Sequence, residues 1–351
     1  MDERARRLRG ETEAVWATAT SFVLGAAAGA LVLGGDARAL TGPGSLAMPL
    51  AVIAGAVAAS AFVVSTVRHH RGETAGMPLW QRVISRLSVV ALTVVFAAIT
   101  AMGVLLAAQV LASGLQGLRL AALGGAMLAG VAAAVGGRFA YGAGIGLRTA
   151  DLAGILFGFL VIGTLFAMAT TADPAWWEQN FSTLGSGGGW AFNGTLVVAG
   201  LIVATVGSYI GRDLHRLVGD AAIGRIATVV VMWALTGAAL AAVGLMPLDR
   251  LPAAHDIAAL STLVLFGGAA VLSTTVIPSA PSALVITTVG VVGLLVVAVV
   301  LCVGIRLYGV TALEAIVVGL GLLWMTTFVR VLAILAPPVS RPSARRTLLA
   351  R

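Results

Sequence analysis

Long apolar stretches recur along the chain at a length that suits a lipid bilayer. A helix of about 20 residues crosses the hydrocarbon core, which is roughly 30 Å thick. Ten stretches of this kind are separated by short polar segments. We therefore predict an all-α, polytopic transmembrane helix bundle. Its ten spans are expected near residues 14–34, 48–67, 88–111, 119–137, 151–170, 190–210, 226–246, 257–277, 284–305 and 312–335.

The first apolar stretch could be read as a secretory signal, with Ala37-Arg38-Ala39 as a cleavage site. Signal cores are about 7–15 residues long, which is shorter than this stretch. We therefore predict that the first span is an uncleaved anchor.

The placement of arginine predicts the orientation of the spans. All 22 basic residues are Arg. If the N-terminus is cytoplasmic, eighteen of them fall on the inner side, and only Arg38, Arg119, Arg250 and Arg306 fall outside. Cytoplasmic segments of membrane proteins carry such an excess of positive charge. We therefore predict that the N- and C-termini are both cytoplasmic.

Composition excludes an ordinary soluble domain. Hydrophobic residues make up 59% of the chain, charged residues only 10%, and the mean hydropathy is +1.03. The net charge of +8 follows from the inner-side arginines, so we predict no nucleic-acid partner. The single cysteine, Cys302, lies inside a predicted span and leaves no intrachain disulfide possible.

Three regions are expected along the chain. Residues 1–150 carry four spans with few polar groups, and residues 151–335 carry six spans and most of the outward-facing polar residues. Residues 336–351 form a short basic tail, which we predict to be disordered. In span five, the spacing of Gly154 and Gly158 favours close approach of a neighbouring helix.

The segment at residues 68–88 lies on the inner side. It separates an apolar helical face (Trp80, Val83, Ile84, Leu87) from Arg82 and Arg86. This pattern indicates either an amphipathic segment along the inner leaflet, where anionic headgroups would be partners, or ordinary inner-side charge. His69 and His70 are adjacent and do not share a helical face, so we interpret them as solvated loop residues.

The loop between spans five and six holds the most unusual sequence, DPAWWEQNFSTLGSGGGWAFN, at residues 173–193. The predicted orientation places it on the outer face. Trp176, Trp177 and Trp190 then suit the headgroup region, where tryptophan is enriched.

Several polar residues are expected near this loop. Ser182 lies in this loop, and Asn193, His255 and Asp256 lie at or near the outer ends of spans, where hydrocarbon offers no hydrogen-bond partners. We predict that they converge into one hydrogen-bonded cluster. The cluster would pin the loop over the bundle and line a shallow pocket open to the outer leaflet.

The second half of the chain resembles a known family. The run Phe181-Ser182-Thr183-Leu184-Gly185, then Ala191-Phe192-Asn193 and Gly200, and later His255-Asp256, resemble the domain of unknown function 998 family. That family consists of six-span prokaryotic membrane proteins without an established activity, and the resemblance covers about residues 150–335. It implies a bacterial cytoplasmic membrane protein and adds Gly185 to the candidate ligand-binding residues. A loosely similar architecture in eukaryotic proteins of lipid remodelling suggests, by analogy, a lipid-related role.

One interpretation of the cluster is purely structural, with Ser182 and Asn193 capping and joining helices and Asp256 near a helix N-terminus. Beside it, three functions remain open at this stage. The first is binding, sensing or handling envelope lipid at the outer face, and the second is secondary transport or export of a small amphiphile. The spans lack the mid-membrane charges typical of ion-coupled carriers. The third is lipid hydrolysis by Ser182, although an adjacent His255-Asp256 pair does not form a catalytic triad.

No catalytic residue, metal site or cofactor is predicted. Three of the four histidines lie on the inner side, and neither an HxxxH nor an HExxH pattern occurs. Nucleotide-binding and haem or iron–sulfur motifs are missing from the sequence as well.

Overall fold

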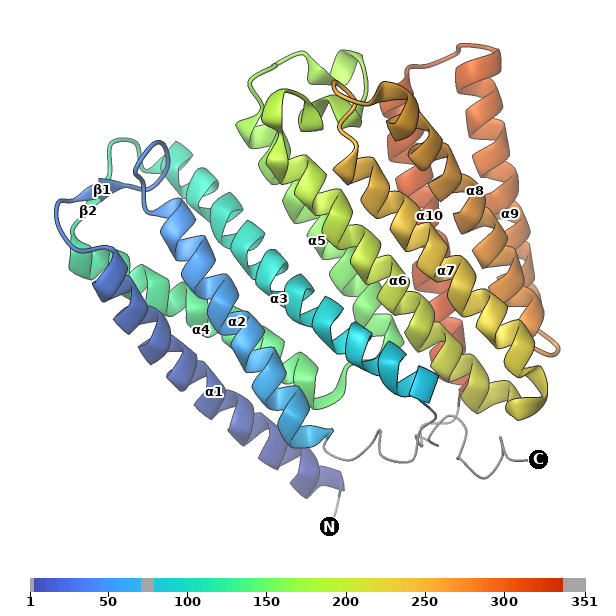
Figure 1. Cartoon of the computed structure of the whole chain (residues 1–351), viewed down its shortest axis with the longest axis horizontal. Helices are drawn as coiled ribbons and strands as arrows, with labels where there is room; N and C mark the ends of the chain where they lie inside the picture. Colours follow the sequence, from blue (N-terminus) through green and yellow to red (C-terminus); the bar gives the residue numbers. More distant parts are fainter. Residues whose placement is uncertain (1–2, 71–78, 337–351) are drawn as a thin grey trace. The chain divides into compact units, whose positions relative to one another are not determined.

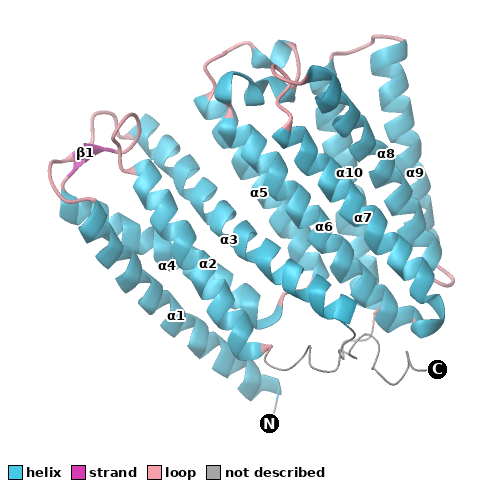
Figure 2. Ribbon diagram, in the orientation of Figure 1, coloured by secondary structure: helices cyan, strands magenta, loops and turns pink. Residues whose placement is uncertain are grey.

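The computed structural model describes residues 3–70 and 79–336, and this part of the chain is almost entirely helical (Figures 1 and 2). Ten of its helices are long and apolar enough to cross a membrane. The described residues contain one short antiparallel pairing, of β1 (Arg38–Ala39) with β2 (Arg119–Leu120). The prediction of an all-α polytopic bundle with ten spans is confirmed, and the chain is a multi-pass membrane protein.

The chain forms two compact units, which are described separately below. Unit 1 comprises residues 1–75 and 89–147, and unit 2 comprises residues 76–88 and 148–351. The helices of unit 1 are α1 (Glu3–Val32), α2 (Ala47–His69), most of α3 (Leu79–Gly114) and α4 (Ala122–Gly146). The long helices of unit 2 are α5 (Thr149–Thr170), α6 (Trp190–Val218), α7 (Ile223–Leu245), α8 (Pro252–Val276), α9 (Ser282–Val299) and α10 (Val310–Leu335). Short helical turns in unit 2 are η1 (Trp176–Glu178), η2 (Phe181–Gly188), η3 (Asp220–Ala222) and η4 (Val300–Gly304). The predicted domain division at residue 150 stays a prediction, since packing does not show that either part folds alone.

In unit 1, α4 packs against both α1 and α2. Leu33, Leu46, Leu50 and Ala129 belong to the buried apolar cluster at this contact. The fourth span differs from its predicted bounds, because β2 occupies residues 119–120 and α4 continues to Gly146. The Ser65 hydroxyl of α2 donates to the Tyr141 carbonyl at 2.7 Å, which ties the last turns of α4 to α2.

The interpretation of His69 and His70 as solvated loop residues is wrong. His69 is the last residue of α2, and its Nδ1 lies 2.8 Å from the Ser65 carbonyl oxygen. Its Nε2 lies 3.2 Å from Oε2 of Glu13, which also accepts from the Tyr141 hydroxyl. His70 contacts the Gly144 carbonyl at 3.1 Å. Both imidazoles therefore link helix ends within unit 1.

The core of unit 2 is a cluster of aromatic side chains. Trp233 and Trp324 are fully buried and stack with ring centroids 5.8 Å apart, and Phe266 and Phe328 pack around them. Their indole N–H groups donate to Ser273 Oγ at 3.0 Å and to Thr288 Oγ1 at 2.9 Å. Because both donors are satisfied, this cluster fills the bundle without leaving an indole N–H unpaired in the apolar interior.

The predicted packing role of Gly154 and Gly158 is wrong. A Cβ atom at either position would meet nothing within 4 Å. In α5 it is Gly163 that lies directly against a neighbour, Thr195 of α6, and backbone atoms approach closely between α6 and α7, the helix pair that packs together most extensively in this unit. The prediction of close approach rested on the spacing of small residues. Spacing alone does not say which neighbouring helix packs against a given helical face.

Two predictions about the inner side stay open. Residues 79–88 continue into α3 as one helix, so they do not form a separate surface helix. Residues 71–78 and the side chain of Trp80 lie outside the described residues, as does the predicted disordered tail from residue 337. A partnership with anionic headgroups therefore remains a prediction.

The loops that carry the predicted site lie at one end of unit 2. In Figure 1 the α5–α6, α7–α8 and α9–α10 connections are all drawn at the top of this unit. Residues far apart in sequence are thereby placed at a single end of the bundle.

Thiol labelling from one side of the membrane tests the predicted orientation of this end of unit 2. We expect a cysteine introduced by Ser186→Cys to react with an impermeant maleimide in intact cells. A cysteine introduced by Ala221→Cys, in the exposed η3 turn at the other end of α6, should react only after the cells are opened. The native Cys302 is buried and contributes little background. The reverse labelling pattern would contradict the predicted topology.

Candidate functional site: the Ser182–His255–Glu314 cluster

The α5–α6 connection, residues 171–189, folds into a defined structure that we call the outer cap. Asn180 caps η2, because its side-chain oxygen accepts from the Thr183 N–H at 3.0 Å. The Thr183 hydroxyl reaches the carbonyl of Trp176 at 3.0 Å, and the Trp176 and Phe181 rings lie 5.1 Å apart. These local contacts turn the first residues of η2 toward the bundle.

Ser182 and His255 meet beneath the outer cap. Ser182 is 7% exposed and His255, from the first turn of α8, is 4% exposed. The Ser182 Oγ lies 2.9 Å from His255 Nε2. His255 Nδ1 lies 2.8 Å from the Met246 carbonyl oxygen, which can only accept a hydrogen bond. Nδ1 therefore carries a proton, and the imidazole is held with Nε2 facing the serine.

Glu314, in the second turn of α10, completes the cluster. Its Oε2 accepts from the Phe181 N–H at 2.5 Å, and its Oε1 lies 3.3 Å from the Ser182 Oγ. Ser182 and His255 were predicted to lie at this site, whereas Glu314 was not assigned to it. The available signal was an acidic side chain just inside an apolar span, a position at which charged groups need partners.

Asn193 and Gly185 form a separate contact beside the cluster. The Asn193 side-chain amide donates to the Gly185 carbonyl at 2.8 Å. A Cβ atom at position 185 would lie 2.2 Å from Asn193 Oδ1, so the amide lies directly against the glycine. This pair joins η2 to the first turn of α6. Within the described residues, no hydrogen bond links Asn193 directly to Ser182 or His255.

Asp256 does not belong to the hydrogen-bonded cluster. It is exposed, and in the described part of the chain it makes no hydrogen bond or ion pair. Neighbouring residues of a helix point about 100° apart, so α8 directs His255 inward and Asp256 outward. The predicted convergence therefore holds for Ser182 and His255 but is wrong for Asp256. The ligand-binding role of Ser182, Gly185, Asn193, His255 and Asp256 stays a prediction.

Further contacts hold the outer cap to the helix ends. Thr311, in the first turn of α10, donates its hydroxyl hydrogen to the Trp177 carbonyl at 2.7 Å. The Gly187 N–H donates to Asp249 of the α7–α8 loop at 3.0 Å. The cap is therefore attached to several segments of unit 2.

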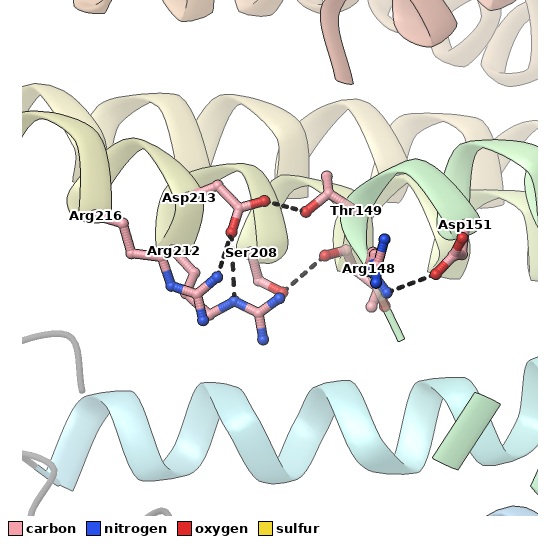
Figure 3. Close-up of polar contacts among 8 residues, drawn as sticks. Arg148, Thr149, Asp151, Ser208, Arg212, Asp213 and Arg216 are labelled. Atoms are coloured by element: carbon pink, nitrogen blue, oxygen red, sulfur yellow. Dashed lines mark hydrogen bonds and ion pairs between the residues drawn. The ribbon is translucent and has the colours of Figure 1, made fainter. Parts of the chain in front are cut away.

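A second polar cluster lies at the opposite end of unit 2 (Figure 3). Asp213 of α6 is only 7% exposed, and it accepts from the Thr149 hydroxyl and, at 3.0 Å, from the Arg216 guanidinium. Arg212 Nε lies 3.7 Å from the same carboxylate, and the Arg212 guanidinium stacks over the Tyr209 ring at 4.2 Å. This carboxylate ties the start of α5 to the end of α6.

The outer cluster has a definite chemistry. It combines a hydroxyl, an imidazole and a carboxyl group, which can exchange hydrogen bonds or a proton. Among the described residues no group of three or more His, Cys, Asp or Glu side chains could hold a metal ion. Comparisons of the chain with protein families, with curated proteins and with solved structures give no match. Function is therefore argued from the geometry.

Proposed function

We propose that this protein binds, senses or handles a lipid of the bacterial envelope at the outer end of unit 2. The observation that carries the proposal is the convergence of Ser182, His255 and Glu314, from three separate segments, beneath one structured cap. Such polar groups at a helix end lie at the depth where lipid headgroups begin. The family resemblance of residues 150–335 agrees with this placement but brings no activity of its own.

Two exposed tryptophans, one in the outer cap and one at the start of α6, support the same proposal. Trp177 is 58% exposed and Trp190 is 52% exposed, although both side chains are large and apolar. Indole side chains favour the membrane–water interface, where an apolar ring and a polar N–H are both accommodated. The cap would thus sit at the headgroup layer with its polar cluster directed into the protein.

The test is lipid selection by the purified full chain. In nanodiscs of phosphatidylethanolamine and phosphatidylglycerol, we expect native mass spectrometry to find one lipid enriched over the bulk mixture. The variant His255→Ala should weaken that enrichment about tenfold, since it removes a hydrogen-bonding partner of the cluster. The matched control is Asp256→Asn, which changes the exposed neighbour and should leave enrichment unaltered.

Two results would contradict the proposal. One is a bound-lipid composition equal to that of the nanodisc. The other is equal enrichment in wild type and His255→Ala while thermal unfolding shows both to be folded.

One contact favours a second candidate, cleavage of a lipid ester. The Ser182 Oγ is 2.9 Å from an imidazole whose Nδ1–H is oriented by the Met246 carbonyl, an arrangement that can activate a serine. Glu314, however, contacts the same Oγ, and the serine is buried. Covalent labelling of Ser182 by a fluorophosphonate, lost in Ser182→Ala, would favour cleavage over binding.

A further inference from the structure

The hydrogen bonds of the outer cluster require one more hydrogen than its groups supply in their usual states. Two contacts are hydrogen bonds, and each contains one hydrogen. The first joins Nε2 of His255 to Oγ of Ser182, and the second joins the same Oγ to Oε1 of Glu314. The Nδ1 proton of His255 is already donated to the Met246 carbonyl. A neutral imidazole and an ionised carboxylate then leave only the Ser182 hydroxyl hydrogen for both contacts.

One added proton satisfies both contacts, and it has two possible positions. On Nε2, it makes an imidazolium that donates to Ser182, and the serine donates to a charged Glu314. On Glu314 it must lie on Oε1, because Oε2 accepts from the Phe181 N–H. The carboxyl group then donates to Ser182, and the serine donates to Nε2. In both arrangements the histidine and glutamate together carry no net charge, as the burial of His255 and the partial burial of Glu314 favour.

We infer that His255, Ser182 and Glu314 form a proton-binding site, which holds one exchangeable proton shared through the serine hydroxyl. Loss of this proton leaves a single negative charge and removes the hydrogen from one of the two contacts. Because Ser182 and Phe181 open η2, the outer cap is then held less firmly to α8 and α10. Binding of a proton and closure of the cap are thereby linked.

Other charged groups at this end lie outside the cluster. Each is exposed, and Asp249 and Asp173 already accept hydrogen bonds from Gly187 and Ala175. Exposed charges are screened by solvent and contribute little to a buried site. These groups, from the cap, the connecting loops and α8, are Asp173, Glu178, Asp249, Arg250, Asp256 and Arg306.

The experiment follows opening of the cap as a function of pH. The full chain with Ser186→Cys is labelled in detergent without added lipid, so the result does not depend on lipid binding. Glu314→Gln is the reference, because its amide can donate to Ser182 while its carbonyl oxygen accepts from the Phe181 N–H. This variant retains both contacts without a titrating carboxyl group, and it also corrects for ionisation of the introduced thiol.

All proteins compared carry Ser186→Cys. We expect the labelling rate of the otherwise wild-type chain, divided by that of Glu314→Gln, to rise about fivefold from acidic to alkaline pH. A fivefold change corresponds to the free energy of about one hydrogen bond. His255→Gln, which cannot take up a proton, should have a flat ratio to Glu314→Gln, and Asp256→Asn should keep the wild-type rise. A flat wild-type ratio would overturn the inference, as would a rise that persists in His255→Gln. If the rise is found but no lipid is enriched, the proton site stands and the proposed function fails.

Discussion

Replacing Gly237 by valine will separate α6 from α7 and sharply reduce the yield of folded protein. A Cβ atom at Gly237 would lie 2.4 Å from the Gly200 carbonyl oxygen and 2.7 Å from the Ala204 nitrogen. A Cβ atom at Gly200 would meet Gly237 and Ala241 at the same distances. All of these neighbours are backbone atoms, which cannot rotate away as a flexible side chain can.

The expected cost is at the upper end of overpacking, about 3 kcal/mol or more. Small residues at helix contacts matter especially in membranes, where close backbone approach replaces much of the hydrophobic driving force. Size-exclusion profiles in detergent and thermal unfolding measure the effect. Gly290→Val is the matched control, because position 290 is exposed on α9 and a Cβ there meets nothing within 4 Å. Equal profiles for the two variants would show that α6 and α7 do not pack as described.

Substitution of Asp213 by alanine is the second large effect, because it removes the anion from a mostly buried ionic cluster. The side chains of Asp213 and Arg216 are only 11% and 16% exposed, and the Arg216 guanidinium donates to this carboxylate at 3.0 Å. Without the carboxylate, the Thr149 hydroxyl loses its acceptor and two guanidinium groups lose their shared counter-charge. Breaking a buried pair from one side costs about 3–5 kcal/mol, and partial solvent access places this case near 3 kcal/mol.

Thermal unfolding of the purified chain in detergent measures this change. Asp220→Ala is the control, because Asp220 also bonds a basic partner, His215, at 2.6 Å, but its side chain is 47% exposed. Exposed pairs contribute about 0–1 kcal/mol, so this variant should unfold close to wild type. If Asp213→Ala is no more destabilised than Asp220→Ala, the cluster in Figure 3 does not hold α5 to α6.

The candidate site was predictable only in part. His255 could be found because it is polar at the end of an apolar span, where a partner is needed, and Ser182 because it lies in the polar loop that joins spans five and six. Glu314 satisfies the same condition as His255, yet no spacing rule places the second turn of α10 beside η2. Asp256 shows the converse, since adjacency to His255 suggested a shared site and the helical rotation of about 100° per residue turned it away.

The glycines show the same limit for packing. Gly154 and Gly158 have the spacing of a close helix contact but meet no neighbour, whereas Gly200 and Gly237 face each other across α6 and α7. Sequence spacing defines a smooth face on one helix. It does not say which helix covers that face, because the choice depends on the rotation and tilt of every helix in the bundle.

The sequence by itself determined the fold class and the number of spans. The thickness of the hydrocarbon core requires apolar segments of about one length, and a helix satisfies the hydrogen bonds of the backbone within each segment. The sequence also determined which polar residues lie at span ends. Only the tertiary structure decided that Ser182 meets His255 and Glu314, that Asn193 bonds Gly185, and that Asp213 is enclosed by Thr149 and two arginines. The physical reason is that, apart from the two arginines beside Asp213, these contacts join residues 8 to 132 positions apart in the chain, and hydrogen bonds act over about 3 Å. A rotation of one helix by a single residue would bring a different side chain to each of these contacts.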